Sequence, residues 1–200
     1  GDTINPADTT MIRYIRAFYD VRMYRSDIQA ACDSLVFCEL DSIARLFERP
    51  VLWNAGKNQL TSTTMQLLMQ DGSVTRGAML EDAMIVTQED TLHYNQIKST
   101  EMTGYFHENQ LYRFDALGGV SAILYLVENE SLTTFNMKEA RSMTAVIKNG
   151  NAEKLLYTET IKSDAYPISE MEIEKQRLKG FEWRGEERPV SRFVVSDRKL

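Results

Sequence analysis

The sequence is poor in the residues that build catalytic and metal sites. Its 200 residues include two cysteines and two histidines, and no GxSxG, CxxC, HExxH or P-loop pattern occurs. On one extended strand Cys32 and Cys38 would lie about 20 Å apart, too far for a disulfide unless a turn folds between them. We therefore expect two free thiols. Since His93 and His107 are too few for a metal site, we predict no catalytic residues, metal or cofactor, and no enzymatic activity.

Long apolar runs and basic tracts are also missing. No apolar run approaches the roughly 20 residues that a membrane-spanning helix needs, and the first residues form no signal peptide and lack an initiator Met. The net charge is −6 and the isoelectric point is near 5.1, which argues against a nucleic-acid binder. With 43% hydrophobic residues in 200, the chain can form one domain with a sizeable core.

What the sequence does contain is a repeat. A 24-residue pattern fits the chain four times, beginning at Asp27, Asn58, Asn95 and Asn136. Each copy has an apolar stretch, a polar turn and a second apolar stretch. The turns are centred on Leu40-Asp41, Asp71-Gly72, Glu108-Asn109 and Asn149-Gly150. A recurring strand–turn–strand unit is typical of a stacked or rolled all-β body.

Two segments lie outside the copies. Residues 12–24 are rich in β-favouring side chains and predict a first long strand. Near the other end, Ser169 and Glu172 form a capping-box pattern and Gly180 suits a C-terminal cap, which predicts a short helix. We therefore divide the chain into a lead-in or severed linker (1–12), a β body (13–166), and a C-terminal helix and tail (167–200).

Methionine occupies the same position in three of the four copies. The alternating positions read Met65-Leu67-Met69, Met102-Gly104-Phe106 and Met143-Ala145-Ile147, against Ser34-Val36-Cys38 in the first copy. If the copies stack, these side chains line one face of a long sheet. That face is either an ordinary core or an apolar trough for acyl chains, to which flexible methionine is suited. In the first copy, Leu35 and Phe37 compete with Val36 and Cys38 for the inward positions.

A basic column accompanies the methionine column. Arg45, Arg76, Arg113 and Lys154 share one position in the four copies. Like charges at the strand spacing repel unless they are solvated or paired with anions. The column is either an exposed ladder or a set of contacts to the phosphates or acidic sugars of a lipid headgroup.

The order of several short motifs resembles the OstA-like branch of the LptA/OstA lipopolysaccharide-transport family. The runs that carry the resemblance are VRMYRSDIQAACDSLVF, RPVLWNAGKNQLTSTTMQLLM, DTLHYNQIKSTEMTGYF and the closing LKGFEWRGEERP. The family repeat, an aromatic strand end followed by Asp and a polar-to-apolar strand, matches Tyr24, Asp27 and residues 32–35. The resemblance covers roughly residues 13–190. Because a leading copy with a signal peptide is missing, we expect a C-terminal piece of a longer protein.

The resemblance implies an all-β fold and a transport task. Members form an open, twisted β-jellyroll and join strand edge to strand edge into a periplasmic bridge along which lipopolysaccharide moves. We expect a non-enzymatic segment of this kind, periplasmic or outer-membrane associated, which binds lipopolysaccharide or a related lipid and other OstA/LptA-like proteins. The predicted groove residues are Val36, Met65, Leu67, Met69, Met102, Phe106, Met143 and Ile147.

Two other classes of function stay open. A structural envelope scaffold with protein-binding edges would have a densely filled interior, whereas a carrier needs space for hydrocarbon. A carbohydrate-binding module would need exposed aromatic platforms, and the only two tryptophans, Trp53 and Trp183, sit in no evident sugar-stacking pattern.

Overall fold

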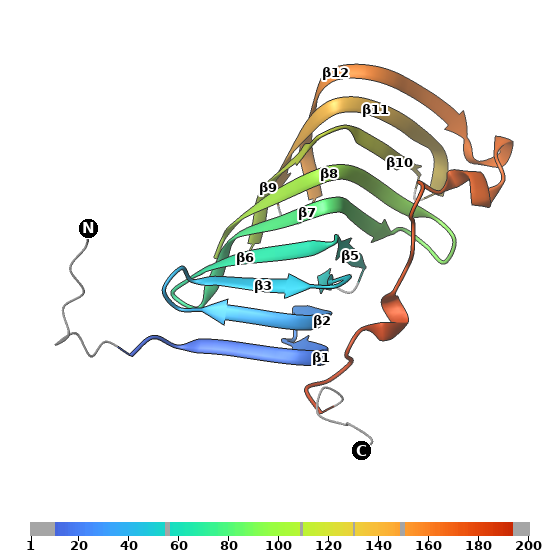
Figure 1. Ribbon diagram of the computed structural model, residues 1–200. Coiled ribbons are helices and arrows are strands. Elements are labelled where there is room, and N and C mark those ends of the chain that lie inside the picture. Colours follow the sequence, from blue (N-terminus) through green and yellow to red (C-terminus); the bar gives the residue numbers. More distant parts are fainter. Residues whose placement is uncertain (1–10, 55–56, 109, 130, 149–150, 194–200) are drawn as a thin grey trace.

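The computed structural model describes residues 11–54, 57–108, 110–129, 131–148 and 151–193. In these residues twelve strands form one antiparallel sheet that is bent across its middle, so that its two halves face each other (Figure 1). The predicted all-β jellyroll is therefore confirmed. No helix in the described ranges is long and apolar enough to cross a membrane.

Strand lengths range from short segments to continuous strands that pass through the bend. The strands are β1 (Tyr14–Tyr24), β2 (Ile28–Cys38), β3 (Ile43–Phe47), β4 (Val51–Asn54), β5 (Asn58–Thr61), β6 (Thr64–Gln70), β7 (Ser73–Gln88), β8 (Tyr94–His107), β9 (Gln110–Leu117), β10 (Val120–Glu128), β11 (Ser131–Lys148) and β12 (Asn151–Pro167). Three 3-10 helices follow: η1 (Ile168–Glu170), η2 (Ile173–Gln176) and η3 (Gly185–Glu187).

The four predicted turns all coincide with hairpins. Residues 39–42 join β2 to β3, and Asp71-Gly72 joins β6 to β7 with φ of 51° and 77°, as a tight hairpin turn requires. Asn109 and residues 149–150 lie outside the described residues, but the flanking strands pair at His107–Gln110 and Lys148–Asn151. The four hairpins lie at one end of the sheet, and we call that side of the bend the hairpin half.

The bend is built from backbone in the left-handed region. Positive φ occurs at Tyr19-Asp20 in β1, Glu48-Arg49 between β3 and β4, Glu81-Asp82 in β7, Gly118-Gly119 between β9 and β10, and Glu159 in β12. At or beside the positions in β1, β7 and β12, the pairing register with the neighbouring strand also shifts. Such bulges turn a strand sharply without ending its pairing. If β3 with β4, β5 with β6 and β9 with β10 are each counted as one strand, these positions recur on every second strand across the sheet. The whole sheet therefore folds along one line.

One position on this line admits only glycine. Gly118 has φ of +82°, and a Cβ there would lie 2.6 Å from Thr100 Cβ. Thr100 Oγ1 also donates a hydrogen bond of 2.7 Å to the Gly118 carbonyl. The β8 strand thus passes directly against the bend between β9 and β10, and any side chain at position 118 would separate them.

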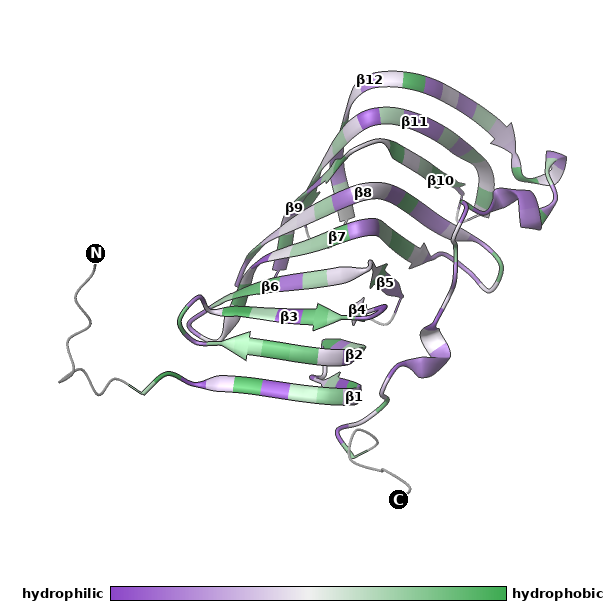
Figure 2. Cartoon of the chain, viewed as in Figure 1, coloured by the Kyte–Doolittle hydropathy of each residue, from purple (hydrophilic) through white to green (hydrophobic). Residues whose placement is uncertain are grey.

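Folding the sheet buries one continuous apolar cluster between its halves. Leu46, Met65, Met102 and Met143 from the hairpin half contribute to it, together with Ala83, Ile97 and Ala122 from the other half. Apolar and polar residues are interspersed along the strands (Figure 2), and apolar residues from both halves meet in this cluster. Most of the hydrophobic stabilisation of this domain comes from this interface.

The C-terminal segment differs from the predicted helix. Residues 168–176 contain only η1 and η2, each without a side-chain cap hydrogen bond. Residues 176–184 then run across the outer face of the other half of the sheet, on the far side of the bend from the hairpin half (Figure 1). We call residues 168–189 the strap, and we call the half of the sheet that it covers the strap half. The helix prediction was wrong because hydrogen bonds from the sheet to the extended backbone outweigh the local helix signal. Phe181 and Trp183 pack on the body, against Tyr94.

Two buried glutamines hold the strap by its backbone. Gln96 donates to the Gln176 carbonyl (2.9 Å) and accepts from the Leu178 N–H (2.8 Å). Gln59 donates to the Glu182 carbonyl (2.7 Å) and accepts from the Arg184 N–H (2.6 Å). Each amide thus binds a carbonyl and an N–H two residues apart, as one residue does in a parallel strand pair. Both glutamines are almost fully buried, at 0% and 1% exposure, so these bonds are shielded from water.

We expect Gln96→Leu to destabilise the protein by about 2–4 kcal/mol, because the change leaves a strap carbonyl and N–H buried without partners. Urea unfolding measures the loss. Gln66→Leu is the matched control, since Gln66 is half-buried on the outer face of the hairpin half, and should change stability by no more than about 0.5 kcal/mol. Equal losses in the two variants would refute the clamp.

The two cysteines are free and should differ in reactivity. Burial and, to a lesser extent, the neighbouring Asp33 raise the pKa of the Cys32 thiol to about 11, whereas Cys38 is only partly buried. Iodoacetamide at pH 8 should therefore label Cys38 and leave Cys32 unlabelled until the protein unfolds. The Cys32 thiol ionises at a lower pH in the unfolded chain than in the folded protein. Its contribution to the free energy of unfolding is therefore intact below pH 9 and is lost as the pH rises towards 11. Peptide mass mapping gives the readout, and early labelling of Cys32 would contradict its burial.

Candidate functional site: an apolar inner face

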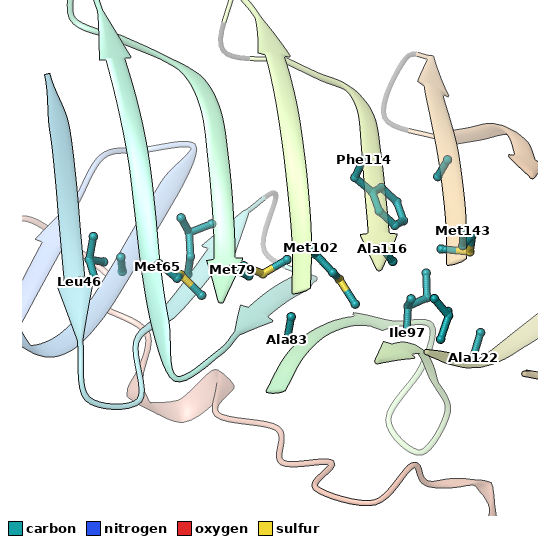
Figure 3. Close-up of a cluster of buried hydrophobic side chains, with 14 of the residues drawn as sticks. Leu46, Met65, Met79, Ala83, Ile97, Met102, Phe114, Ala116, Ala122 and Met143 are labelled. Carbon is teal, nitrogen blue, oxygen red and sulfur yellow. The ribbon is translucent and has the colours of Figure 1, made fainter. Parts of the chain in front are cut away.

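The methionine column forms a real row on the inner face. Cross-strand pairing connects nine residues through the hairpin half, from β1 to β12: Ala17, Leu35, Leu46, Met65, Met79, Met102, Ala116, Met143 and Tyr157. We call this the first inner row. Met65, Met102 and Met143 are 1–2% exposed and their side chains point into the fold (Figure 3). Beside the bend, the inner face is therefore filled with packed side chains.

A second inner row lies two residues further from the bend. It consists of Ile15, Phe37, Ala44, Leu67, Gly77, Gly104, Phe114, Ala145 and Leu155. Several of its members are small, and Leu67 and Phe37 are only partly buried. Packing is thus looser here than in the first inner row.

Towards the hairpin tips the inner face becomes accessible. Met69, Phe106, Leu111 and Ile147 are all partly exposed. Along β6 and β8, exposure increases from Met65 and Met102 beside the bend towards the tips. The inner face therefore grades from a closed core at the bend to an accessible apolar surface at the tips.

Val36 does not belong to this face. Leu35 and Phe37 pack on the central cluster, so Val36 between them points to the outer face, where it pairs with Arg45. We correct the first-copy parity accordingly. The alignment failed because copy one carries its inward residue one position later than the others: Leu35, not Ser34, stands in the row of Met65. The other seven predicted groove residues lie on the inner face.

The inner face also carries one polar group without a partner. Tyr157, at the β12 end of the first inner row, has a buried hydroxyl that makes no hydrogen bond within the described residues. Burial raises the pKa of this phenol, and Lys138 Nζ lies 4.8 Å from its ring centre. The β12 end of the inner face is therefore more polar than its middle.

The basic column lies on the opposite, outer face. Arg76, Arg113 and Lys154 share one cross-strand row with Tyr105 and Val146. Arg45 stands one row nearer the bend, paired with Gln66. The predicted single column thus becomes two adjacent rows.

Two members of the basic column are neutralised by carboxylates. Arg45 donates to Asp41 over 2.6 Å, which holds the pKa of that carboxyl below its usual value. Arg113 pairs with Asp115 over 2.9 Å, and this hydrogen bond raises the pKa of the guanidinium. Arg76, Arg113 and Lys154 are all exposed, but only Arg76 and Lys154 form no ion pair within the described residues, so they offer most charge to a ligand.

Cavities on the surface are polar and lie at the bend. One of about 280 Å³ is lined by Glu81, Asp82 and Lys98, and another of about 200 Å³ by Arg49, Asp82 and Glu182 among others. In the first, Lys98 is paired with Asp82 over 2.6 Å. Neither is a place for hydrocarbon. Among the described residues, no group of three His, Cys, Asp or Glu side chains could hold a metal ion.

Some important residues were missed by the repeat. Met79 on β7 completes the methionine row; it lies in the second apolar stretch of copy two, which the predicted methionine column did not use. The strap-binding glutamines were also missed, although Gln59 and Gln96 each follow the first residue of a copy. With copy one shifted by one residue, Gln29 joins them, and all three are buried. A polar residue that recurs beside a buried strand was the available signal.

Comparison with known proteins supports the fold. No family model matches the sequence, and no curated protein does. Among solved structures, the fold is similar to LptH, described as the LptA homologous periplasmic component of the lipopolysaccharide transport device of Pseudomonas aeruginosa. The TM-score is 0.50 at 11% identity, over 70% of this chain and 93% of LptH. The resemblance to the LptA/OstA family is thus confirmed at the level of the fold: this chain is a β-jellyroll of the LptA type.

Proposed function

We propose that this protein is a non-enzymatic, lipid-binding segment of a periplasmic lipopolysaccharide-transport bridge. The observation that carries the proposal is the graded inner face, closed beside the bend and accessible at the hairpin tips. The fold that the chain shares with LptH, a component of a lipopolysaccharide transport device, supports the same reading.

The packing suggests where acyl chains would lie. Met65, Met102 and Met143 are at most 2% exposed, so they form a floor rather than a channel. Leu67, Met69, Phe106 and Ile147 are accessible and would line the site that the chains enter. Each buried CH₂ contributes roughly 0.8 kcal/mol. Partial burial on an accessible face would keep several chains from binding too tightly to be passed on.

The headgroup would remain near the hairpin tips. Arg76 and Lys154 lie on the outer face, close to the tips of the β6–β7 and β11–β12 hairpins. A phosphorylated headgroup that emerges from the inner face could reach them around the tips. Arg45 and Arg113 are already paired with carboxylates and would contribute less.

The two ends of the sheet suit assembly into a bridge. Within the described residues β1 pairs only with β2, and β12 only with β11, so each presents an edge without a strand partner. Exposed edges are templates for another β protein. Large apolar side chains are also exposed there, including Phe18 (51%) on β1 and Ile161 (76%) on β12.

A structural envelope scaffold remains the second candidate. The dense packing of the first inner row favours it, because a scaffold needs a filled core and no hydrocarbon space. Lipid contact on the inner face distinguishes the two functions.

A photocrosslinking residue at position 67 should capture lipopolysaccharide, and one at position 66 should not. Leu67 packs on the inner cluster, and Gln66 faces outwards beside Arg45, whose charge is already paired with Asp41. Both lie on β6 and both are partly buried, so the pair is a matched control. Gel analysis of irradiated, folded protein gives the readout. Capture at neither site, or equally at both, would favour the scaffold.

Phe18→Lys should weaken edge-to-edge association about tenfold, or 1.4 kcal/mol, because it places charge beside the β1 edge. Sedimentation velocity over a concentration series measures the association. Leu92→Lys is the control: Leu92 is 56% exposed but lies between β7 and β8, in the middle of the sheet and away from either edge. A wild-type protein that stays monomeric throughout the series, or a Phe18 variant that associates normally, would rule out assembly through this edge.

A further inference from the structure

The ring of Phe106 rests on bare backbone at the accessible side of the inner face. Gly77 and Gly104 are cross-strand partners in the second inner row. A Cβ on Gly104 would lie 3.3 Å from Phe106 Cε2 and 3.1 Å from Leu111 Cδ1. A Cβ on Gly77 would lie 3.5 Å from the same ring carbon. The ring therefore fills the space that two side chains would otherwise occupy.

A local irregularity in the sheet puts the ring there. Tyr105 pairs with Arg113, but the next pair is Phe106 with Leu111, so Tyr112 is left as an extra residue. The bulge brings Phe106 and Leu111 side by side over Gly104. Bulges commonly re-aim a side chain in this way.

The Phe106 ring is also placed so that it can move away from the two glycines. Phe106 is the penultimate residue of β8, which ends at His107, and it is partly exposed. By contrast, Met102 on the same strand is 1% exposed in the closed core. Rotation of the Phe106 side chain towards solvent would uncover the two glycines without disturbing the first inner row.

We propose that Phe106 is a specificity-determining residue of the lipid site, a stopper that occupies the place of an acyl chain over Gly77 and Gly104. The inference rests on the proposed function. When a chain enters, the ring swings aside; when the chain leaves, the ring returns. Both occupants are apolar, so the exchange replaces one hydrocarbon contact by another, which lowers the net affinity for the chain and favours its release.

The stopper lowers apparent affinity in a predictable manner. A ligand that binds only when the ring is out has its affinity reduced by the fraction of protein in that state. If that fraction is about 10%, at the upper end for a minor conformer, removal of the ring should tighten binding about tenfold. A larger ring should weaken binding.

The test is equilibrium binding of a fluorescent single-chain fatty acid to the full chain carrying Phe106→Ala or Phe106→Trp. The alanine variant should bind about tenfold tighter than wild type, and the tryptophan variant more weakly. Tyr105→Ala is the matched control, because Tyr105 is the preceding aromatic and faces outwards beside Arg113. It should leave affinity unchanged.

Each outcome separates the stopper from its alternatives. If Phe106 were only a structural residue, both variants would bind more weakly, and if it were only a lipid contact, the alanine variant would. Either result overturns the inference while leaving the lipid site in place, since wild type still binds. If neither wild type nor Phe106→Ala binds the probe, the proposed function fails together with the stopper. Thermal melting of each variant confirms that a folded protein was measured.

Discussion

The architecture depends on the line of left-handed residues that bends the sheet. Tyr19-Asp20, Glu48-Arg49, Glu81-Asp82, Gly118-Gly119 and Glu159 all adopt positive φ, and all but the glycines do so against a steric preference of roughly 1–2 kcal/mol per residue. What offsets this cost is the apolar cluster between the two halves, which could not form on a flat sheet. The bend also creates the gradient along the inner face: side chains beside it meet partners from the other half, and those near the hairpin tips do not. The core and the accessible surface therefore lie at two ends of the same strands.

The strap gives the two outer faces different characters. Over the strap half, Leu178, Phe181 and Trp183 pack on Met84, Val86 and Tyr94, and an ion pair between Arg49 and Glu182 (2.7 Å) fixes the strap near the bend. The strap half is therefore covered on both sides, as a core layer would be. The outer face of the hairpin half carries Arg76 and Lys154 in the open. If the inner face carries lipid, the strap half is the stiff wall of the site and the hairpin half the more deformable one.

Local signals in the sequence predicted the strands and turns well, because each depends on a few neighbouring residues. Asp71-Gly72 specifies its hairpin by backbone preference alone, and the methionine spacing placed Met65, Met102 and Met143 in one row. Val36 was misplaced because inward parity depends on how copy one is aligned, which a single sequence with one shifted copy does not determine. The bend was not predicted either, because Glu48, Arg49 and Glu81 are not residue types that favour positive φ. The strap does not form the helix that its capping-box pattern predicts, because its conformation is set by hydrogen bonds to Gln59 and Gln96, more than 80 residues earlier.

The glutamine clamps have a consequence for how the strap can change over time. Each amide recognises a carbonyl and an N–H two residues apart, groups that nearly every amino acid supplies. The two clamps therefore constrain the distance between Gln176-Leu178 and Glu182-Arg184, rather than the identity of the residues there. Substitutions in the strap should be tolerated so long as they keep its apolar anchors, whereas the insertion or deletion of one residue would put one clamp out of step with the other. Between its two clamps, the strap is therefore constrained in length more than in sequence.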